Sequence, residues 1–350
     1  MDTWATSSLS PMIVTGWMDD PDLFARTFPM DLRPQSHDII RTWLFSSIVR
    51  SHYEFDAVPW SNVAISGFIV DPDRKKLSKS AGNQPDDPMT LIERHGADAL
   101  RYWAAQGRPG LDMAFEEGQM KICRRLATKL LNASRFALNL GPDPRDVDPS
   151  TAPGAPLDRA VLAGLADLVD EATLSFEQFD YARAIERTES FFWPFCDDYL
   201  ELVKNRAYGA AGDPARDSVL VSLRIGLEVF LKLFAPFLPF VTEEVWSWWK
   251  PGSIHRSTWP QSAPLRAAAD PRPPAGLLGA AGEILSLIRK AKTAAQVSMR
   301  APVVRVTVKA DRAKLDLVQM SEADIRNAGV VEAALDLVEA EEFSVHAELA

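Results

Sequence analysis

Apolar residues recur at steps of three and four through the middle of the chain, and this spacing predicts long helices from about residue 115 onwards. The first apolar stripe consists of Cys123, Leu126, Leu130, Ala133 and Ala137. Three later stretches share the spacing, at residues 157–175, 181–208 and 218–234. A proline inside the second stretch predicts a kink or a break there. We therefore expect a helical bundle.

Shorter patterns at both ends predict mixed α/β structure. Residues 1 to about 60 alternate between helical and extended patterns, and the apolar run at residues 65–70 is typical of a buried strand. A helix is expected from about Ser36, with Ser36 or Asp38 capping its start. Near the C-terminus a helix precedes a strand in which Val304, Val306 and Val308 should face inward. A short helix at residues 322–328 follows it.

Two stretches rich in proline and small residues interrupt the helical patterns. Residues 141–156 have the composition of a loop, and residues 251–274 that of a linker. We therefore expect an α/β domain at residues 1–113, a helical domain at 114–262 and a small α+β domain at 275–350. A chain of 350 residues is long enough for two or three such cores.

Composition narrows the class of protein. Hydrophobic residues make up 47% of the chain and charged residues 25%, as in ordinary soluble globular proteins. The two cysteines, Cys123 and Cys196, are too far apart in sequence to suggest a CxxC metal pair, so no structural zinc is expected. No apolar run reaches the roughly 20 residues that span a bilayer. The N-terminus lacks the pattern of a signal peptide, and a cytoplasmic location is expected.

The net charge of −10 argues against indiscriminate binding of nucleic acid, because phosphate backbones are bound by lysine and arginine. A local basic patch is nevertheless present on the first long helix. Lys121, Arg125 and Lys129 lie four residues apart, and Arg124 is adjacent. This basic ridge is the best candidate for contact with a phosphate backbone. A solvated helix face would show the same pattern.

Residues 75–83, here called the signature segment, read KKLSKSAGN and follow the predicted strand after an Asp-Pro-Asp turn. Lysine supplies a positive charge, and serine hydroxyls and loop amides supply hydrogen bonds. A loop of this kind is suited to holding phosphates, although a solvated basic turn has a similar composition.

The string KLSKS closely resembles the KMSKS signature of class I aminoacyl-tRNA synthetases, with Leu77 where methionine is usual. The flanks from Gly67 to Asn83 are similar to that family too, and the surrounding sequence resembles valyl-tRNA synthetases in particular. The resemblance extends over essentially all 350 residues. It implies an α/β remnant, the C-terminal half, of a Rossmann-like catalytic fold of the class I type, followed by an all-α anticodon-binding bundle and a small α+β unit. It also implies that valine and ATP form valyl-adenylate, from which tRNA(Val) takes the acyl group.

The resemblance assigns roles within the signature segment. Lys79, with Lys76 second, would neutralise charge on the departing pyrophosphate. Ser78 and Ser80 would shape the ATP-binding loop, to which Gly67 also belongs. Magnesium would accompany the ATP, because it bridges phosphate oxygens.

Two segments resemble the family's amino-acid pocket, Asp2-Thr3-Trp4 and His37-Asp38-Ile39-Ile40. By this resemblance Trp4 and Ile39 would wall the valine side chain, and Asp38 would accept its α-ammonium group. An apolar slot and a carboxylate suit these two groups. Asp38 could instead be an ordinary helix cap, and His37 is expected to be structural.

The strings at residues 192–201 and 236–246 resemble the anticodon-binding domain of valyl-tRNA synthetases. This resemblance makes tRNA the expected macromolecular partner. It adds Lys204 and Arg206 to the basic ridge as residues that could contact the RNA backbone.

The chain also departs from the family pattern. The second family signature, HIGH, is absent, and none of the five histidines lies in such a context. An inserted editing domain is absent too. We therefore expect the chain to be unable to form adenylate alone, unless an N-terminal half is supplied in trans; otherwise a monomer is expected.

Two alternative functions remain. One is a non-catalytic tRNA-binding protein derived from a synthetase. The other is the related isoleucine enzyme, which often carries a zinc knuckle with paired cysteines that this sequence lacks.

Overall fold

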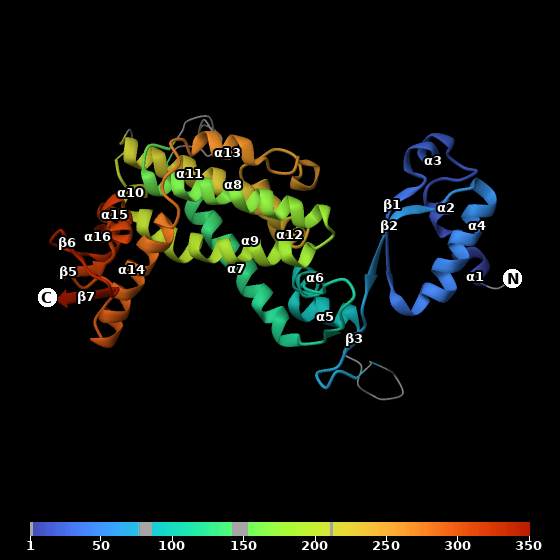
Figure 1. The fold of residues 1–350 in the computed structure, drawn as a ribbon, viewed down its shortest axis with the longest axis horizontal. Coiled ribbons are helices and arrows are strands. Elements are labelled where there is room, and N and C mark those ends of the chain that lie inside the picture. Colours follow the sequence, from blue (N-terminus) through green and yellow to red (C-terminus); the bar gives the residue numbers. More distant parts are fainter. Residues whose placement is uncertain (1–2, 76, 78–85, 142–152, 211–212) are drawn as a thin grey trace.

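The computed structural model describes residues 3–75, 77, 86–141, 153–210 and 213–350. Three parts follow one another along its long axis (Figure 1): an N-terminal α/β unit, a large helical part and a small C-terminal α+β unit. The N-terminal unit lies apart from the helices, and β3 leads from it toward them. This is the expected order of fold types.

The N-terminal unit is built around two parallel strands, β1 (Met30–Ser36) and β2 (Trp60–Ser66), which pair from Met30 with Trp60 to Ser36 with Ser66. Its other elements are α1 (Thr3–Ser7), α2 (Ser10–Val14), α3 (Pro21–Thr27), a 3-10 turn η1 (His37–Ile39), a π-helical turn η2 (Ile40–Leu44) and α4 (Phe45–Phe55).

The predicted cap is wrong. Ser36 makes no side-chain capping bond because it is still part of β1, and Asp38 lies inside η1.

The run at residues 65–70 is not one strand. β2 ends at Ser66, and a separate strand, β3 (Ile69–Val70), pairs in parallel with β4 (Met113–Ala114). Gly67 lies between β2 and β3 against the segment before β4, where an added Cβ would come within 2.3 Å of the Leu111 carbonyl oxygen. No side chain fits there. The break is therefore a crossing point that only glycine allows.

The helical part has the long helices that the apolar spacing predicts, and the stripe from Cys123 to Ala137 is buried in its core. Its helices are α5 (Pro88–His95), α6 (Ala97–Ala105), α7 (Glu117–Leu138), α8 (Pro156–Glu177), α9 (Tyr181–Pro194), α10 (Leu200–Ala207), α11 (Pro214–Phe234) and α12 (Pro239–Ser247). At Pro194 the chain does not kink outward but continues through a π-helical turn, η5 (Phe195–Tyr199), into α10. A π-helical turn accommodates the loss of the backbone hydrogen bond that proline, which has no amide hydrogen, cannot make.

The stretch predicted to be a free linker is packed onto the helical part. It contains a 3-10 turn, η6 (Ile254–Arg256), and α13 (Ser262–Ala268). Arg266 forms ion pairs with Asp167 and Asp170 of α8, and Trp259 Nε1 donates to the Thr173 hydroxyl at 2.9 Å. The stretch has the composition of a linker, but Arg266 and Trp259 hold it against α8.

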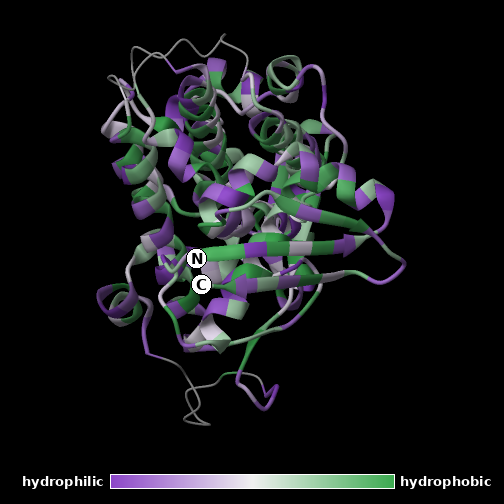
Figure 2. Cartoon of the chain, turned by 90° about the vertical axis from the view of Figure 1, so that its left-hand side faces the viewer, coloured by the Kyte–Doolittle hydropathy of each residue, from purple (hydrophilic) through white to green (hydrophobic). Residues whose placement is uncertain are grey.

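The C-terminal unit consists of a three-stranded sheet, in the order β6-β5-β7, and three helices. Its elements are α14 (Leu277–Ala294), β5 (Val303–Ala310), α15 (Arg312–Met320), α16 (Glu322–Gly329), β6 (Leu335–Glu339) and β7 (Ser344–Leu349). Figure 2 shows hydrophilic and hydrophobic positions alternating along this sheet. Val306 and Val308 are buried as predicted, but Val304 is 40% exposed because the strand register shifts between Val303 and Arg305.

A buried ion-pair network joins the helical part to the C-terminal unit. Asp158 of α8 is fully buried and accepts hydrogen bonds from the Tyr199 and Ser218 hydroxyls and from both terminal nitrogens of Arg206. Arg206 also donates to Asp324 of α16 at 2.7 and 3.1 Å. Burial lowers the pKa of Arg206, but the hydrogen bonds and charges of the two carboxylates raise it overall.

This network corrects one prediction. Arg206 is not a residue that contacts an RNA backbone, because its guanidinium is buried and bonded to two carboxylates and to the Ala215 carbonyl. The periodicity of a helix cannot reveal such a pairing, since Asp324 is more than a hundred residues away in sequence.

Replacement of Arg206 by alanine should destabilise the protein strongly. It leaves Asp158 charged, buried and without its cation, which costs about 3–5 kcal/mol in comparable buried pairs. Urea denaturation followed by circular dichroism measures the loss. Arg266→Ala is the matched control: it also removes an arginine paired to two aspartates, but at the surface, so the midpoint should change little. Equal midpoints for the two variants would contradict a structural role for the network.

Candidate nucleotide and RNA site

The structure describes the entry to the signature segment. β3 ends at Val70, and the Asp71 and Lys75 backbones close a turn in which Asp71 N–H donates to the Lys75 carbonyl at 2.9 Å. Lys75 N–H in turn donates to an Asp71 carboxylate oxygen at 2.7 Å. Lys76, Ser78, Lys79 and Ser80 lie outside the described residues. Gly67 has the packing role described above.

The chain leaves the signature segment through a capped helix. Asp87 is the N-cap of α5 and accepts from the backbone N–H groups of Met89 and Thr90 at 2.9 and 3.2 Å. Hydrogen bonding, chiefly from the Thr90 side chain, lowers the pKa of this carboxyl. A cavity of about 540 Å³ separates the entry from the exit, and Leu77 is among its lining residues, together with Ile69, Asp86, Asp87, Pro88, Leu91, Leu100, Trp103 and Phe115.

A charged junction connects this exit to the start of α7. Arg94, near the end of α5, contacts Asp86 at 2.6 Å and Glu117, the first residue of α7, at 2.9 Å. His95 Nε2 lies 2.6 Å from the same Glu117 oxygen. The hydrogen bonds from Arg94 and then His95 lower the pKa of Glu117. Two consecutive side chains of α5 therefore hold the end of α7 on which the basic ridge begins.

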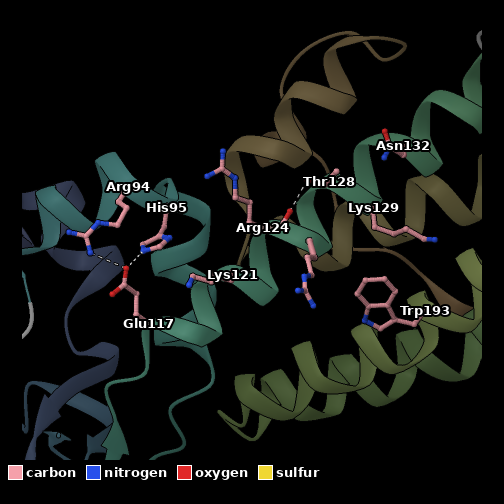
Figure 3. Close-up of a pocket in the computed structure, with 10 residues that line it drawn as sticks. Arg94, His95, Glu117, Lys121, Arg124, Thr128, Lys129, Asn132 and Trp193 are labelled. Carbon is pink, nitrogen blue, oxygen red and sulfur yellow. Dashed lines mark hydrogen bonds and ion pairs between the residues drawn. The ribbon is translucent and has the colours of Figure 1, made fainter. Parts of the chain in front are cut away.

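The basic ridge lies along α7 immediately after this junction. Lys121, Arg124 and Arg125 are exposed, and no ion pair is found for them among the described residues. Lys129, one turn further on, contacts Asp197 at 2.6 Å. The ridge lines a pocket of about 840 Å³ (Figure 3), whose other lining residues are Arg94, His95, Glu117, Thr128, Asn132 and Trp193.

The residues predicted for the amino-acid pocket are in the N-terminal unit. Trp4 lies on α1, and Asp38 and Ile39 lie on η1. The Trp43 Nε1 donates to the Ser7 carbonyl at 2.6 Å, which ties α1 to the helical segment after η1. Trp4 is 49% exposed and Asp38 is exposed, so both side chains are open to solvent. These residues lie away from the ridge (Figure 1).

His37 has structural contacts. Its Nδ1 lies 3.3 Å from the Ser66 carbonyl oxygen, and its ring packs edge-on against Phe68 with the centroids 4.3 Å apart. The expectation of a structural role for this histidine agrees with these contacts.

The sequence alone missed several residues of the pocket. Trp193 lies in the string at residues 192–201, but the sequence singles out neither this side chain nor Arg94, His95 and Glu117. Only Glu117 carried a usable signal, because it begins the helix that bears the ridge.

The described residues contain no cluster of three or more histidine, cysteine or carboxylate side chains that could hold a metal ion. Cys123 and Cys196 are buried free thiols. None of the described helices is long and apolar enough to cross a bilayer.

Family models match two regions of the chain. Residues 1–116 match tRNA synthetases class I (I, L, M and V), and residues 158–308 match the anticodon-binding domain of tRNA ligase. The second match runs through α13 and α14 into β5, so it crosses the stretch that the sequence predicted to be a linker.

Similar proteins agree with these matches. Curated relatives include the valine--tRNA ligases of Salinispora tropica, 53% identical over 95% of this chain, and Thermobifida fusca, 54% identical over 100% of it. Among solved structures, the ternary complex of Agrobacterium radiobacter K84 LeuRS with tRNA and LeuAMS has a TM-score of 0.60 at 22% identity. It covers 76% of this chain and 33% of that chain. Mycobacterium tuberculosis methionyl-tRNA synthetase has a TM-score of 0.55 at 22% identity, over 69% of this chain and 48% of that chain.

The chain spans about 40% of the length of the two curated relatives. Identities from 48% to 54% nevertheless extend over nearly all of its own length. Sequence similarity, both family models and the fold agree: the chain belongs to the class I tRNA synthetases and is homologous to their valine--tRNA ligases.

Proposed function

We propose that the chain forms the part of a valine--tRNA ligase that binds the phosphates of ATP and the backbone of tRNA(Val). One structural observation supports it most directly. The exit of the signature segment and the first turn of the basic ridge are held together by Arg94 and Glu117. A segment suited to phosphates and a surface suited to RNA are therefore parts of one continuous body.

In the first step, the valine carboxylate attacks the α-phosphate of ATP, and pyrophosphate leaves. The protein contributes by positioning the reactants and by neutralising the charge that develops on the leaving group. Lys79 and Lys76 supply the positive charge that neutralises it, and Ser78 and Ser80 add hydrogen bonds. Mg²⁺ enters as part of the ATP substrate. Trp4 and Ile39 contact the valine side chain, and Asp38 binds its ammonium group. Trp4 and Asp38 are exposed, so both can be reached by the amino acid.

In the second step, tRNA lies along α7. Lys121, Arg124 and Arg125 contact its phosphates, because these cations are exposed and have no acidic partner among the described residues. Lys129 contributes less, since Asp197 already neutralises it. The ridge gives affinity and orientation rather than sequence selectivity, because it addresses the backbone.

Adenylate formation also needs a partner polypeptide that completes the sheet of the N-terminal unit. Parallel strands are normally covered on both faces, yet β1 and β2 form a two-stranded parallel sheet in the described chain. Large apolar side chains around them are exposed, including Trp4, Ile13, Val14, Met18, Phe45 and Tyr53. Arg33 of β1 is buried, and its guanidinium lies 3.2 Å from the centroid of the Trp43 ring. A polypeptide that covers the exposed apolar side chains would remove them from water.

Lys121→Ala combined with Arg125→Ala should weaken the binding of tRNA(Val). Each lost phosphate contact means that about one counterion fewer is released on binding. The slope of log affinity against log salt concentration should therefore become less negative by about 1–2 units. Fluorescence anisotropy with labelled tRNA(Val), titrated at several salt concentrations, measures both quantities. Lys309→Ala is the matched control, because Lys309 is an exposed lysine on β5, far from the ridge. An unchanged slope in the double variant would show that RNA binds elsewhere.

Valine-dependent exchange of pyrophosphate into ATP should be absent for the chain alone. It should appear when the chain is mixed with the part of the Thermobifida fusca relative that lies outside the region matched by this chain. Lys79→Ala should abolish the recovered exchange, because it removes the main cation that neutralises the negative charge on the leaving pyrophosphate. Exchange by the chain alone would disprove the need for a partner. Full exchange by the mixed Lys79→Ala variant would disprove the role of the lysine.

A further inference from the structure

A second cavity, of about 490 Å³, lies between α6 and α9. Its volume is in the range of pockets that enclose a small molecule. Ala182 and Ile185 of α9 are buried and give it an apolar wall, and Tyr102 lines it from α6. Trp193 lines this cavity as well as the pocket of the ridge. The cavity is therefore suited to a ligand that has an apolar body.

Glu189 is the carboxylate that the two helices hold at this cavity. One of its oxygens accepts from the Trp193 Nε1 at 3.0 Å, and the other accepts from the Tyr102 hydroxyl at 2.5 Å. Burial, and then the hydrogen bond to Glu189, raise the pKa of Tyr102, so its hydroxyl stays protonated and remains a donor. Both donors are neutral, so they orient the carboxylate without cancelling its charge. Each carboxylate oxygen can still accept a second hydrogen bond.

The charges that line the cavity do not balance. Arg108 is the one cation among the described residues that line it, and it contacts Glu186 at 2.7 Å. No ion pair is found for Glu189 within the described part of the chain. One negative charge therefore remains uncompensated beside an apolar wall and two aromatic side chains. A carboxylate next to aromatic rings is the combination that binds organic cations, because both groups attract positive charge.

We propose that the cavity between α6 and α9 binds a small organic cation with a single positive charge, of the arylalkylamine class. Its ammonium group pairs with Glu189 beside Trp193, and its apolar body packs on Ala182 and Ile185. An anion is disfavoured, because the one lining cation is already paired with Glu186. The inference is independent of the RNA-binding function proposed for the ridge, since it concerns a different cavity and a ligand of the opposite charge.

Isothermal titration calorimetry of the full chain with 2-phenylethylamine tests this proposal. 2-Phenylethanol has the same aromatic body without the charge, so it should bind about 10-fold more weakly than the amine. Glu189→Gln removes the carboxylate charge and keeps the size of the side chain, so the affinity for the amine should fall to that for the alcohol. Glu93→Gln is the matched control, because Glu93 is an exposed glutamate of α5 that does not line the cavity. It should leave both affinities unchanged.

Arg108→Ala makes the opposite change. It removes the lining cation and releases Glu186, so the affinity for the amine should rise by about 2- to 5-fold, a gain that a loss of folding cannot produce. An unaltered chain that does not bind the amine, or that binds amine and alcohol equally, would overturn the proposal. An unchanged affinity in Glu189→Gln or in Arg108→Ala would also overturn it. An equal loss in Glu189→Gln and Glu93→Gln would do the same, since the amine would then respond only to the net charge of −10.

Discussion

The guanidinium of Arg206 makes five hydrogen bonds, four of them to Asp158 and Asp324 and one to the Ala215 carbonyl. These bonds connect α8, α10 and α16, so they fix the C-terminal unit to the helical part. A buried charge of this kind is stable only when every donor has an acceptor, and here the planar fork of arginine meets two carboxylates. The Tyr199 and Ser218 hydroxyls complete the shell around Asp158. The network therefore fixes the relative position of these three helices.

Positive charge without an acidic partner is concentrated at one place on the surface of this acidic chain. Many of its arginines are paired with carboxylates on the same surface, as Arg266 is with Asp167 and Arg187 with Glu171. The exposed cations at the start of α7 differ, because no acidic partner is found for them within the described residues. The net charge of −10 repels a polyanion, and the cations of the ridge attract it locally. Specific docking of RNA is therefore compatible with a net charge of −10.

The features that were predicted from the sequence are those that depend on local periodicity. The buried stripe from Cys123 to Ala137 identified α7, since a helix with one apolar face has few other ways to bury it. The failures involve partners distant in sequence. Arg206 has the same appearance as an exposed cation until Asp324 is placed beside it, and a tryptophan such as Trp193 in a helix suggests core packing. The register shift beside Val304 leaves no mark in the alternation of valines.

Gly67 places the start of the signature segment and the start of α7 against a common backbone crossing. β3 and β4 pair immediately beyond it, and the chain continues from β3 into the signature segment and from β4 into the basic ridge. The two backbones pack directly against each other at Gly67, without a side chain between them, so neither can shift there without moving the other. A rotation of α7 would therefore be passed through β4 to β3 and to the turn at residues 71–75. The backbone crossing therefore couples the position of the start of the ridge helix to that of the turn that enters the signature segment.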